Sequence, residues 1–263
     1  MTRRIGWTIV VGTVLLAVLG PWIAPDPYAL DLSQRLNGPS WQHPFGIDEL
    51  GRDVLGRLIV GGRVSLLVGL AVVSMSATIG VSVGAVAGYA GGWIDEVLGR
   101  LMDVLLAFPG ILLAIALVAV LGPSLSHVVM ALVVIGWVGY ARLVRGQVLK
   151  LRELEYVQAA RALGARPIRV LVRHIVPATL PSVTVQATLG MAAAIISEAS
   201  LSFLGLGVQP PTPSWGTMLD AGRSHLFDAP HLTIFPGVAI ALLVLGFNFV
   251  GDALRDALDP RAI

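Results

Sequence analysis

The stretch EYVQAARALGARPIRVLVRHIVPATLP, residues 155–181, is basic and interrupted by glycine and proline in a chain that is otherwise strongly apolar. Its first part favours a short helix that ends at Gly164, because glycine accepts a positive φ without penalty, and Pro167 suits the first turn of a second helix. We expect Pro177 and Pro181 to end that second helix before the next apolar run. The stretch therefore predicts two short helices joined by a bend.

The apolar surroundings of this stretch place the chain in a membrane. Of its 263 residues 56% are hydrophobic and 13% charged, and the mean hydropathy is +0.82. Such a chain cannot cover a soluble core with polar surface. Six apolar runs approach the roughly 20 residues that cross the hydrocarbon layer. They lie at 5–24, 65–90, 104–122, 128–148, 181–205 and 234–252.

The first run is expected to be an anchor, since it exceeds the apolar region of a secretory signal and no A-x-A cleavage site follows it. With the N-terminus in the cytoplasm, alternation across six spans places the loop 142–173 and the C-terminus there as well. Of the 18 Lys and Arg residues, those left outside are Arg35, Arg52, Arg57, Arg63 and Arg223. This distribution agrees with the positive-inside rule, so we expect a multi-pass inner-membrane protein with both ends cytoplasmic.

The segment 25–63 is too polar to span the membrane and is expected on the outer side. Within it DELGRDVLGRLI, residues 48–59, predicts a short interfacial helix with Asp48 as its N-cap. Asp53 is expected to pair with Arg57 at i,i+4. A metal cluster is the alternative interpretation of the acidic residues and histidine of this segment, His43, Asp48, Glu49 and Asp53. Capping and pairing explain these residues more simply, so no metal site is predicted.

Two stripes of small residues predict a closely packed bundle. GVSVGAVAG, residues 80–88, places Gly80, Gly84 and Gly88 at four-residue intervals, with Ser76 one step earlier. Such stripes let membrane helices approach closely. The fifth apolar run carries a second stripe, formed by Gln186, Gly190, Ala194 and Ser197. We expect both stripes to face another helix, within the chain or in a partner.

Polar residues inside apolar runs are the usual candidates for a translocation path. Here they are Gln186, Glu198 and Asn248. Glu198 lies roughly 26 Å along a helix from Pro181, which predicts a place near the outer interface, either in partial water or paired between helices. For Gln186 and Asn248, a structural hydrogen bond between helices is the alternative to a role in the path.

Motifs of catalysis are missing from the sequence. Lys150, the single lysine, follows no glycine-rich phosphate loop, and neither H-E-x-x-H nor G-x-S-x-G occurs. The chain has no cysteine, which excludes disulfides and thiolate metal sites. We therefore expect a non-catalytic membrane protein that binds no cofactor and no nucleic acid. An ion-coupled secondary transporter stays open as another class, although it should show inverted repeats and ionisable residues at mid-membrane.

The basic loop at 155–181 suggests contact with a partner protein. Ala159 and Ala160 are adjacent small residues beside Tyr156 and Leu163, and they leave room for another protein's surface. The alternative is a basic amphipathic loop that rests on anionic lipid headgroups.

This loop also resembles a known family. QAARALG at 158–164, followed by IVP at 175–177, resembles the EAA loop of ATP-binding-cassette importer permeases. Two positions depart from the family pattern: Gln158 stands in place of a glutamate, and Val176 in place of a leucine. This chain therefore lacks any charge contact that the glutamate would make. Further stretches resemble the second permease subunit of dipeptide, oligopeptide and nickel importers, namely 43–66, 198–219 and 251–261.

The resemblance implies an all-α, six-span bundle of the type I importer permease kind with a cytoplasmic coupling helix. It divides the chain into a transmembrane anchor (1–24), an extracytoplasmic segment (25–63), a permease core (64–255) that contains the loop 150–180, and a cytoplasmic tail (256–263). It also implies which residues dock on an ATPase subunit: Tyr156, Gln158, Ala159, Ala160, Leu163, Gly164, Ile175 and Pro177.

The same resemblance implies partners and cargo. The expected partners are a homologous permease subunit, two ATPase subunits that bind ATP and Mg, an extracytoplasmic solute-binding protein and the lipid of a bacterial or archaeal inner membrane. Di- or oligopeptides are the expected cargo, because EASLSFLGLG at 198–207 resembles the peptide-type subunits. Nickel remains the alternative cargo.

Overall fold

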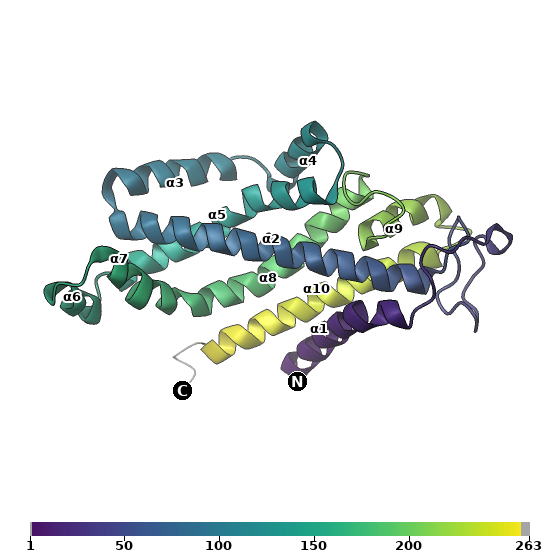
Figure 1. The fold of residues 1–263 in the computed structure, drawn as a ribbon, viewed down its shortest axis with the longest axis horizontal. Coiled ribbons are helices and arrows are strands. Elements are labelled where there is room, and N and C mark those ends of the chain that lie inside the picture. The colour runs from purple at the N-terminus through teal and green to yellow at the C-terminus, as the bar shows by residue number, and fades with distance from the viewer. Residues whose placement is uncertain (1, 259–263) are drawn as a thin grey trace.

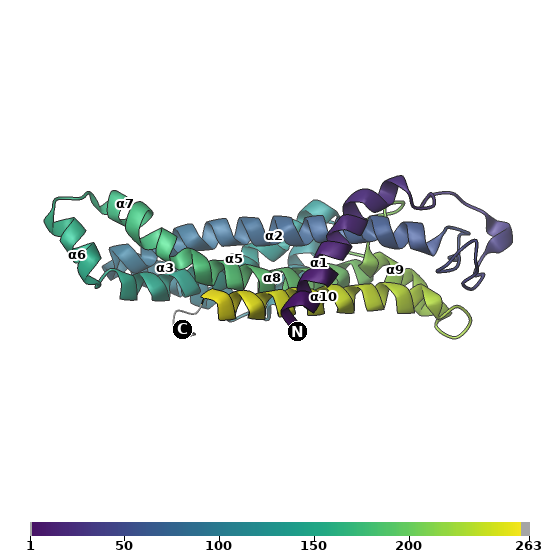
Figure 2. The same ribbon diagram turned by 90° about the horizontal axis from the view of Figure 1, so that it is seen from below.

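Residues 2–258 of the computed structural model are described, and they form an elongated bundle of α-helices (Figure 1). Five helices are long and apolar enough to cross a membrane. They are α1 (Thr2–Leu19), α2 (Val54–Ala90), α5 (Leu125–Leu151), α8 (Val176–Phe203) and α10 (His231–Leu258). In the perpendicular view the bundle is thin, and α1 crosses α10 obliquely (Figure 2). The expected all-α membrane architecture is confirmed.

The contact between α2 and α5 forms the centre of the bundle. A Cβ added at Gly80 would lie 2.6 Å from the carbonyl oxygen of Trp137, and one added at Gly88 would lie 2.9 Å from that of Arg145. Only glycine lets the two backbones approach this closely. The prediction that the first small-residue stripe faces another helix is confirmed, and its partner is α5 of the same chain.

The predicted third span at 104–122 is wrong as a single helix. Its residues are divided between α3 (Gly92–Leu106) and α4 (Gly110–Leu121), which are bent by 84° relative to each other. Pro109 stands at the N-cap of α4, where its ring and its missing N–H prevent α3 from continuing. If the bent pair counts as one span, the chain has the six spans that the sequence predicts.

α3 begins well before the predicted span because its charged residues have partners on α5. Arg145 forms a two-bond ion pair with Asp95, in which Nη2 lies 2.7 Å from Oδ2. Further along α3, Asp103 pairs with Arg142 of α5. These ion pairs let a helix with several charges pack along α5.

The short interfacial helix predicted at 48–59 is also wrong, because its apolar half belongs to α2. Asp53, and not Asp48, caps α2, and its side chain accepts a hydrogen bond of 2.9 Å from the Gly56 N–H. Asp53 pairs with His43 at 2.8 Å rather than with Arg57. The Arg57 Nε instead lies 3.4 Å from the Asp48 carboxylate. Asp48, the cap expected from the sequence, instead accepts hydrogen bonds from the Leu50 and Arg52 N–H groups, both at 2.9 Å.

The prolines after the basic loop do not end a helix, contrary to the prediction. α7 (Pro167–Val170) passes through a π-helical turn, Leu171–Ile175, directly into α8. Pro177 stands in the first turn of α8, and Pro181 lies inside it. Membrane helices tolerate proline where local π turns accommodate the disrupted backbone bonds. One continuous rod therefore connects the basic loop to the core.

Candidate functional site

The helix α6 (Glu155–Ala162) projects from one end of the bundle, beyond the ends of α5 and α8 (Figures 1 and 2). It is attached by Val157, which is fully buried in the main hydrophobic core. Ala160 is half-buried and packs against the same core. One side of α6 is thus fixed to the bundle, and the remaining sides are free of it.

Four of the eight residues expected to dock are exposed on α6 or at its C-cap. Tyr156 is 46% exposed and Leu163 89% exposed, and Gln158 and Ala159 are exposed between them. Ala160 points toward the core, so the expectation that both alanines offer room to a partner holds for Ala159 alone. We call the four exposed residues the α6 surface; it consists of three largely apolar side chains and one polar one, Tyr156, Ala159, Leu163 and Gln158.

Two predicted docking residues lie elsewhere. Ile175 is fully buried in the π-helical turn and holds the loop to the core. Pro177 is exposed in the first turn of α8. Neither belongs to the α6 surface. The resemblance to the EAA loop therefore includes residues that hold the loop to the core as well as residues on its exposed side.

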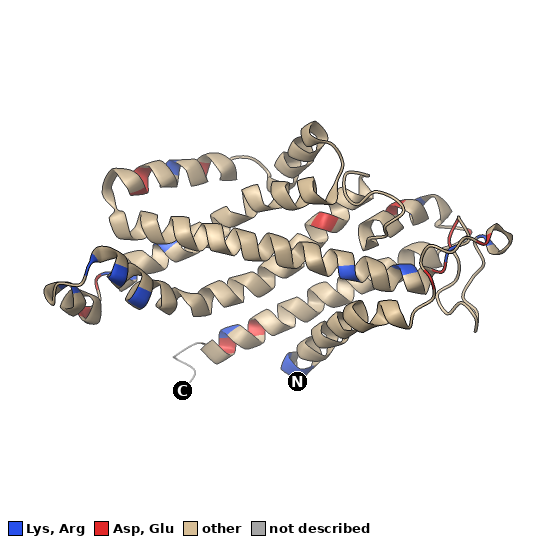
Figure 3. Cartoon of the chain, in the orientation of Figure 1, with Lys and Arg blue, Asp and Glu red and all other residues tan. Residues whose placement is uncertain are grey.

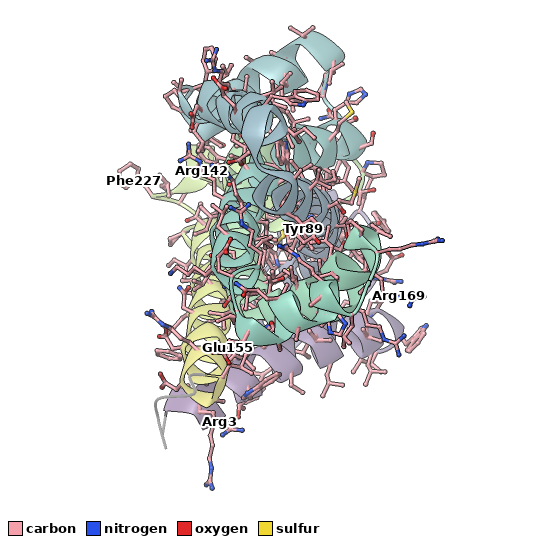
Figure 4. The ribbon with its side chains drawn as sticks, turned by 90° about the vertical axis from the view of Figure 1, so that its left-hand side faces the viewer. Arg3, Tyr89, Arg142, Glu155, Arg169 and Phe227 are labelled. Carbon is pink, nitrogen blue, oxygen red and sulfur yellow. The ribbon has the colours of Figure 1, made fainter. Side chains whose placement is uncertain are left out.

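Polar contacts tie the end with α6 to α2. The Arg161 guanidinium lies 5.0 Å from the centre of the Tyr89 ring, a cation–π geometry. Arg152 Nη1 donates a 2.9 Å hydrogen bond to the Gly88 carbonyl. Figure 4 views the molecule from this end, with Tyr89 and Glu155 labelled near the viewer. Sequence reasoning missed these contacts because the partners are far apart along the chain.

Gly164 ends α6 as the sequence predicts. Its φ is +83°, and the following Ala165 N–H bonds the Ala160 carbonyl at 3.1 Å. Pro167 begins α7. The helix, the glycine turn and the proline-started helix are therefore confirmed as the geometry that links α6 to α8.

Glu198 is fully buried between α2 and α8. Its carboxylate accepts hydrogen bonds from Ser65 Oγ at 2.9 Å and from Ser202 Oγ at 2.7 Å. The expectation that it sits in partial water is wrong, and pairing between helices is what the structure shows. Buried hydroxyl partners satisfy a carboxyl that water cannot reach.

The other two polar residues of the proposed path lie apart from Glu198. Gln186 borders two cavities on α8, one of about 280 Å³ and one of about 490 Å³. The second stripe, which contains Gln186, borders the smaller cavity, and it also faces α5 and α2 as predicted. A Cβ added at Gly190 would collide with the Tyr140 hydroxyl and lie 3.4 Å from Val73. Asn248 is half-buried on α10. The structure does not bring the three residues into one site.

The arrangement of the long helices is similar to that of a solved transporter. A chain of the structure described as inward-facing conformations of the MetNI methionine ABC transporter superposes with a TM-score of 0.61. The match covers 77% of this chain and 96% of that one, at 19% sequence identity. The fold is that of a type I importer permease, an integral-membrane subunit of an ATP-binding-cassette transporter.

Sequence comparison identifies the family. Residues 80–263 match the family described as binding-protein-dependent transport system inner membrane component. The dipeptide transport system permease protein DppC of Alkalihalophilus pseudofirmus is 46% identical over 98% of this chain and 85% of its own length. The glutathione transport system permease protein GsiD of Shigella dysenteriae serotype 1 is 49% identical over 96% of this chain and 84% of its own. The chain therefore belongs to the binding-protein-dependent transport system inner membrane components.

Proposed function

We propose that this permease forms half of the translocation path of an ATP-driven importer for di- or oligopeptides, together with a homologous permease subunit. The names of its relatives specify dipeptide and glutathione transport, and they match nearly the whole chain. Cargo reaches the pair from an extracytoplasmic solute-binding protein. The chain itself has no catalytic role, and ATP and Mg bind to two partner ATPase subunits.

The α6 surface is the proposed contact with one ATPase subunit, and its geometry is the observation that carries the proposal. An exposed apolar patch facing water is costly unless a partner covers it. Val157 and the Arg161–Tyr89 contact make α6 move with the bundle rather than independently. When ATP closes the ATPase pair, α6 transmits the displacement through α7 and the π-helical turn to α8.

The proposed orientation places α6, α7 and both termini in the cytoplasm. Lys and Arg are concentrated at the end with α6 and α7 (Figure 3). The opposite end carries the irregular segment 23–53 and α9 (Trp215–Gly222), which face the binding protein in this orientation. Part of the predicted tail 256–263, including Arg261, lies outside the described residues.

Reconstitution tests the proposed function. Liposomes that contain this chain, its partner permease and two ATPase subunits are supplied with the binding protein and a labelled dipeptide. We expect uptake that requires ATP on the cytoplasmic side of the membrane. No uptake is expected when a proton or sodium gradient is the sole source of energy. Uptake driven by an ion gradient without ATP, or uptake of nickel in place of peptide, would contradict the proposal.

Replacement of Gly164 tests the turn that follows α6. We expect Gly164→Val to cost on the order of 1–2 kcal/mol, because a β-branched residue is strained at positive φ. No atom lies within 4 Å of the added Cβ, so strain and not collision is the cause. The measured consequence is a lower ratio of peptide taken up to ATP hydrolysed, with unchanged amounts in the membrane. Gly164→Asn, which tolerates this backbone conformation, is the matched control and should couple almost normally.

A further inference from the structure

A cavity of about 280 Å³ lies among α2, α4, α5 and α8. Its polar lining consists of the hydroxyls of Ser76, Tyr140 and Ser197 and the amide of Gln186. None of the residues that border it is charged, within the part of the chain that the structure describes. Ile111 and Ala193 on its border are exposed. The cavity is therefore a mainly apolar, uncharged recess with four polar side chains on its border.

Two of these hydroxyls are buried without a hydrogen-bond partner. Ser76 is 1% exposed and Tyr140 4% exposed, and neither oxygen is bonded to any group of residues 2–258. Leaving a buried polar group unsatisfied is unfavourable, and native proteins do so rarely. The other serine and threonine hydroxyls of α2 all have partners. Ser74 donates to the Leu70 carbonyl at 2.6 Å. Thr78 and Ser82 bond their own helix in the same way, and Ser65 donates to Glu198. Ser76 and Tyr140 thus differ from their neighbours.

Glycines pack directly against both hydroxyls. A Cβ at Gly136 would lie 2.7 Å from Ser76 Oγ, and a Cβ at Gly190 would collide with the Tyr140 oxygen. Any other residue at these two positions would press on the hydroxyls. The border of the cavity thus contains two buried hydroxyls that lack a hydrogen-bond partner within residues 2–258, each packed against the backbone of a glycine.

We propose that this cavity binds the peptide amide of the cargo as it passes through the permease. Hydroxyls donate and accept, and the glutamine amide does both, so together they match the N–H and C=O of a peptide group. The uncharged lining does not suit an ammonium or carboxylate end, and it lacks the imidazole and carboxylate ligands that nickel requires. This inference rests on the proposed function and names the residues that would contact the substrate: Ser76, Tyr140, Gln186 and Ser197.

The test uses the complete reconstituted importer with its binding protein and a labelled dipeptide. We expect Ser76→Ala and Tyr140→Phe each to lower kcat/KM for uptake about three- to tenfold, the size of one lost hydrogen bond. The melting temperature of the purified complex should stay the same or rise, because each variant removes an unsatisfied buried hydroxyl. Ser74→Ala is the matched control on the same helix, and it should change kcat/KM less than twofold.

The outcomes separate the two proposals. If wild-type liposomes take up peptide and the variants do so with unchanged kcat/KM, the cavity holds water or lipid and the inference is overturned while the proposed function stands. A lower melting temperature with unchanged kcat/KM assigns the hydroxyls a structural role and also overturns it. If the wild type shows no ATP-dependent peptide uptake, both proposals fail together.

Discussion

Gly84→Val is expected to prevent stable packing of α2 on α5 and to remove most folded protein from the membrane. The added Cβ would lie 3.0 Å from the Ala141 Cα and closer still to its carbonyl oxygen. Overpacking a core commonly costs about 1–3 kcal/mol, and here we expect the upper end because backbone, not a flexible side chain, must move. Size-exclusion chromatography of detergent extracts and the melting temperature of what remains measure the effect.

Gly12→Val on α1 is the matched control for this prediction. Among the described residues 2–258, no non-neighbouring atom lies within 4 Å of a Cβ added there, and the helix propensity change is the same. We expect the control to behave like the wild type. Equal yields and melting temperatures for the two variants would show that the α2–α5 contact does not determine the fold.

Glu198→Ala is expected to lower the free energy of unfolding by about 2–3 kcal/mol, because it leaves two buried hydroxyls without their acceptor and opens a cavity. Ser65 and Ser202 are both fully buried, so water does not readily replace the carboxylate. Glu198→Gln keeps the size of the side chain and one acceptor oxygen, and we expect it to cost less than half as much. Thermal unfolding of the purified chain gives both values.

A double-mutant cycle makes the cause of this loss specific. Once Glu198 is replaced by alanine, Ser65→Ala should cost little more, because the hydroxyl has already lost its partner. Fully additive losses from Glu198→Ala and Ser65→Ala would mean that the 2.9 Å contact between them does not stabilise the bundle.

The sequence predicts the architecture well where one local signal dominates. Apolar length predicts the long helices, the spacing of Gly80, Gly84 and Gly88 predicts a close contact with another helix, and Gly164 with Pro167 predicts the turn after α6. Each of these signals is a property of a few neighbouring residues. No tertiary contact is needed to interpret them.

Predictions fail where distant residues decide between local alternatives. Asp48 is the cap that the sequence predicts, but Asp53 caps α2 and also pairs with His43, while Asp48 pairs with Arg57. Proline stops a helix at Pro109 but not at Pro177, which stands just after a π-helical turn that accommodates the disrupted backbone bonds.

The candidate site follows the same division. The α6 surface is evident from the sequence, apart from the inward orientation of Ala160, which depends on how α6 packs. Gln186 stood out as a polar residue in an apolar run. Tyr140 did not, because an aromatic residue in a membrane helix is ordinary, and its unsatisfied hydroxyl appears only when α5 faces α2 and α8.

Cysteine cross-linking tests the central claim, that this permease is coupled to an ATPase through the α6 surface. The native chain contains no cysteine, so Ala159→Cys introduces a single reactive position on the exposed side of α6. Gly38→Cys, exposed in the segment at the opposite end of the bundle, is the control. Membranes that contain co-expressed ATPase subunits with single surface cysteines are oxidised with and without ATP. We predict an adduct from position 159 whose yield changes with ATP, and none from position 38. Absence of any adduct from position 159 in membranes that actively import peptide would contradict the account and favour contact of α6 with lipid headgroups.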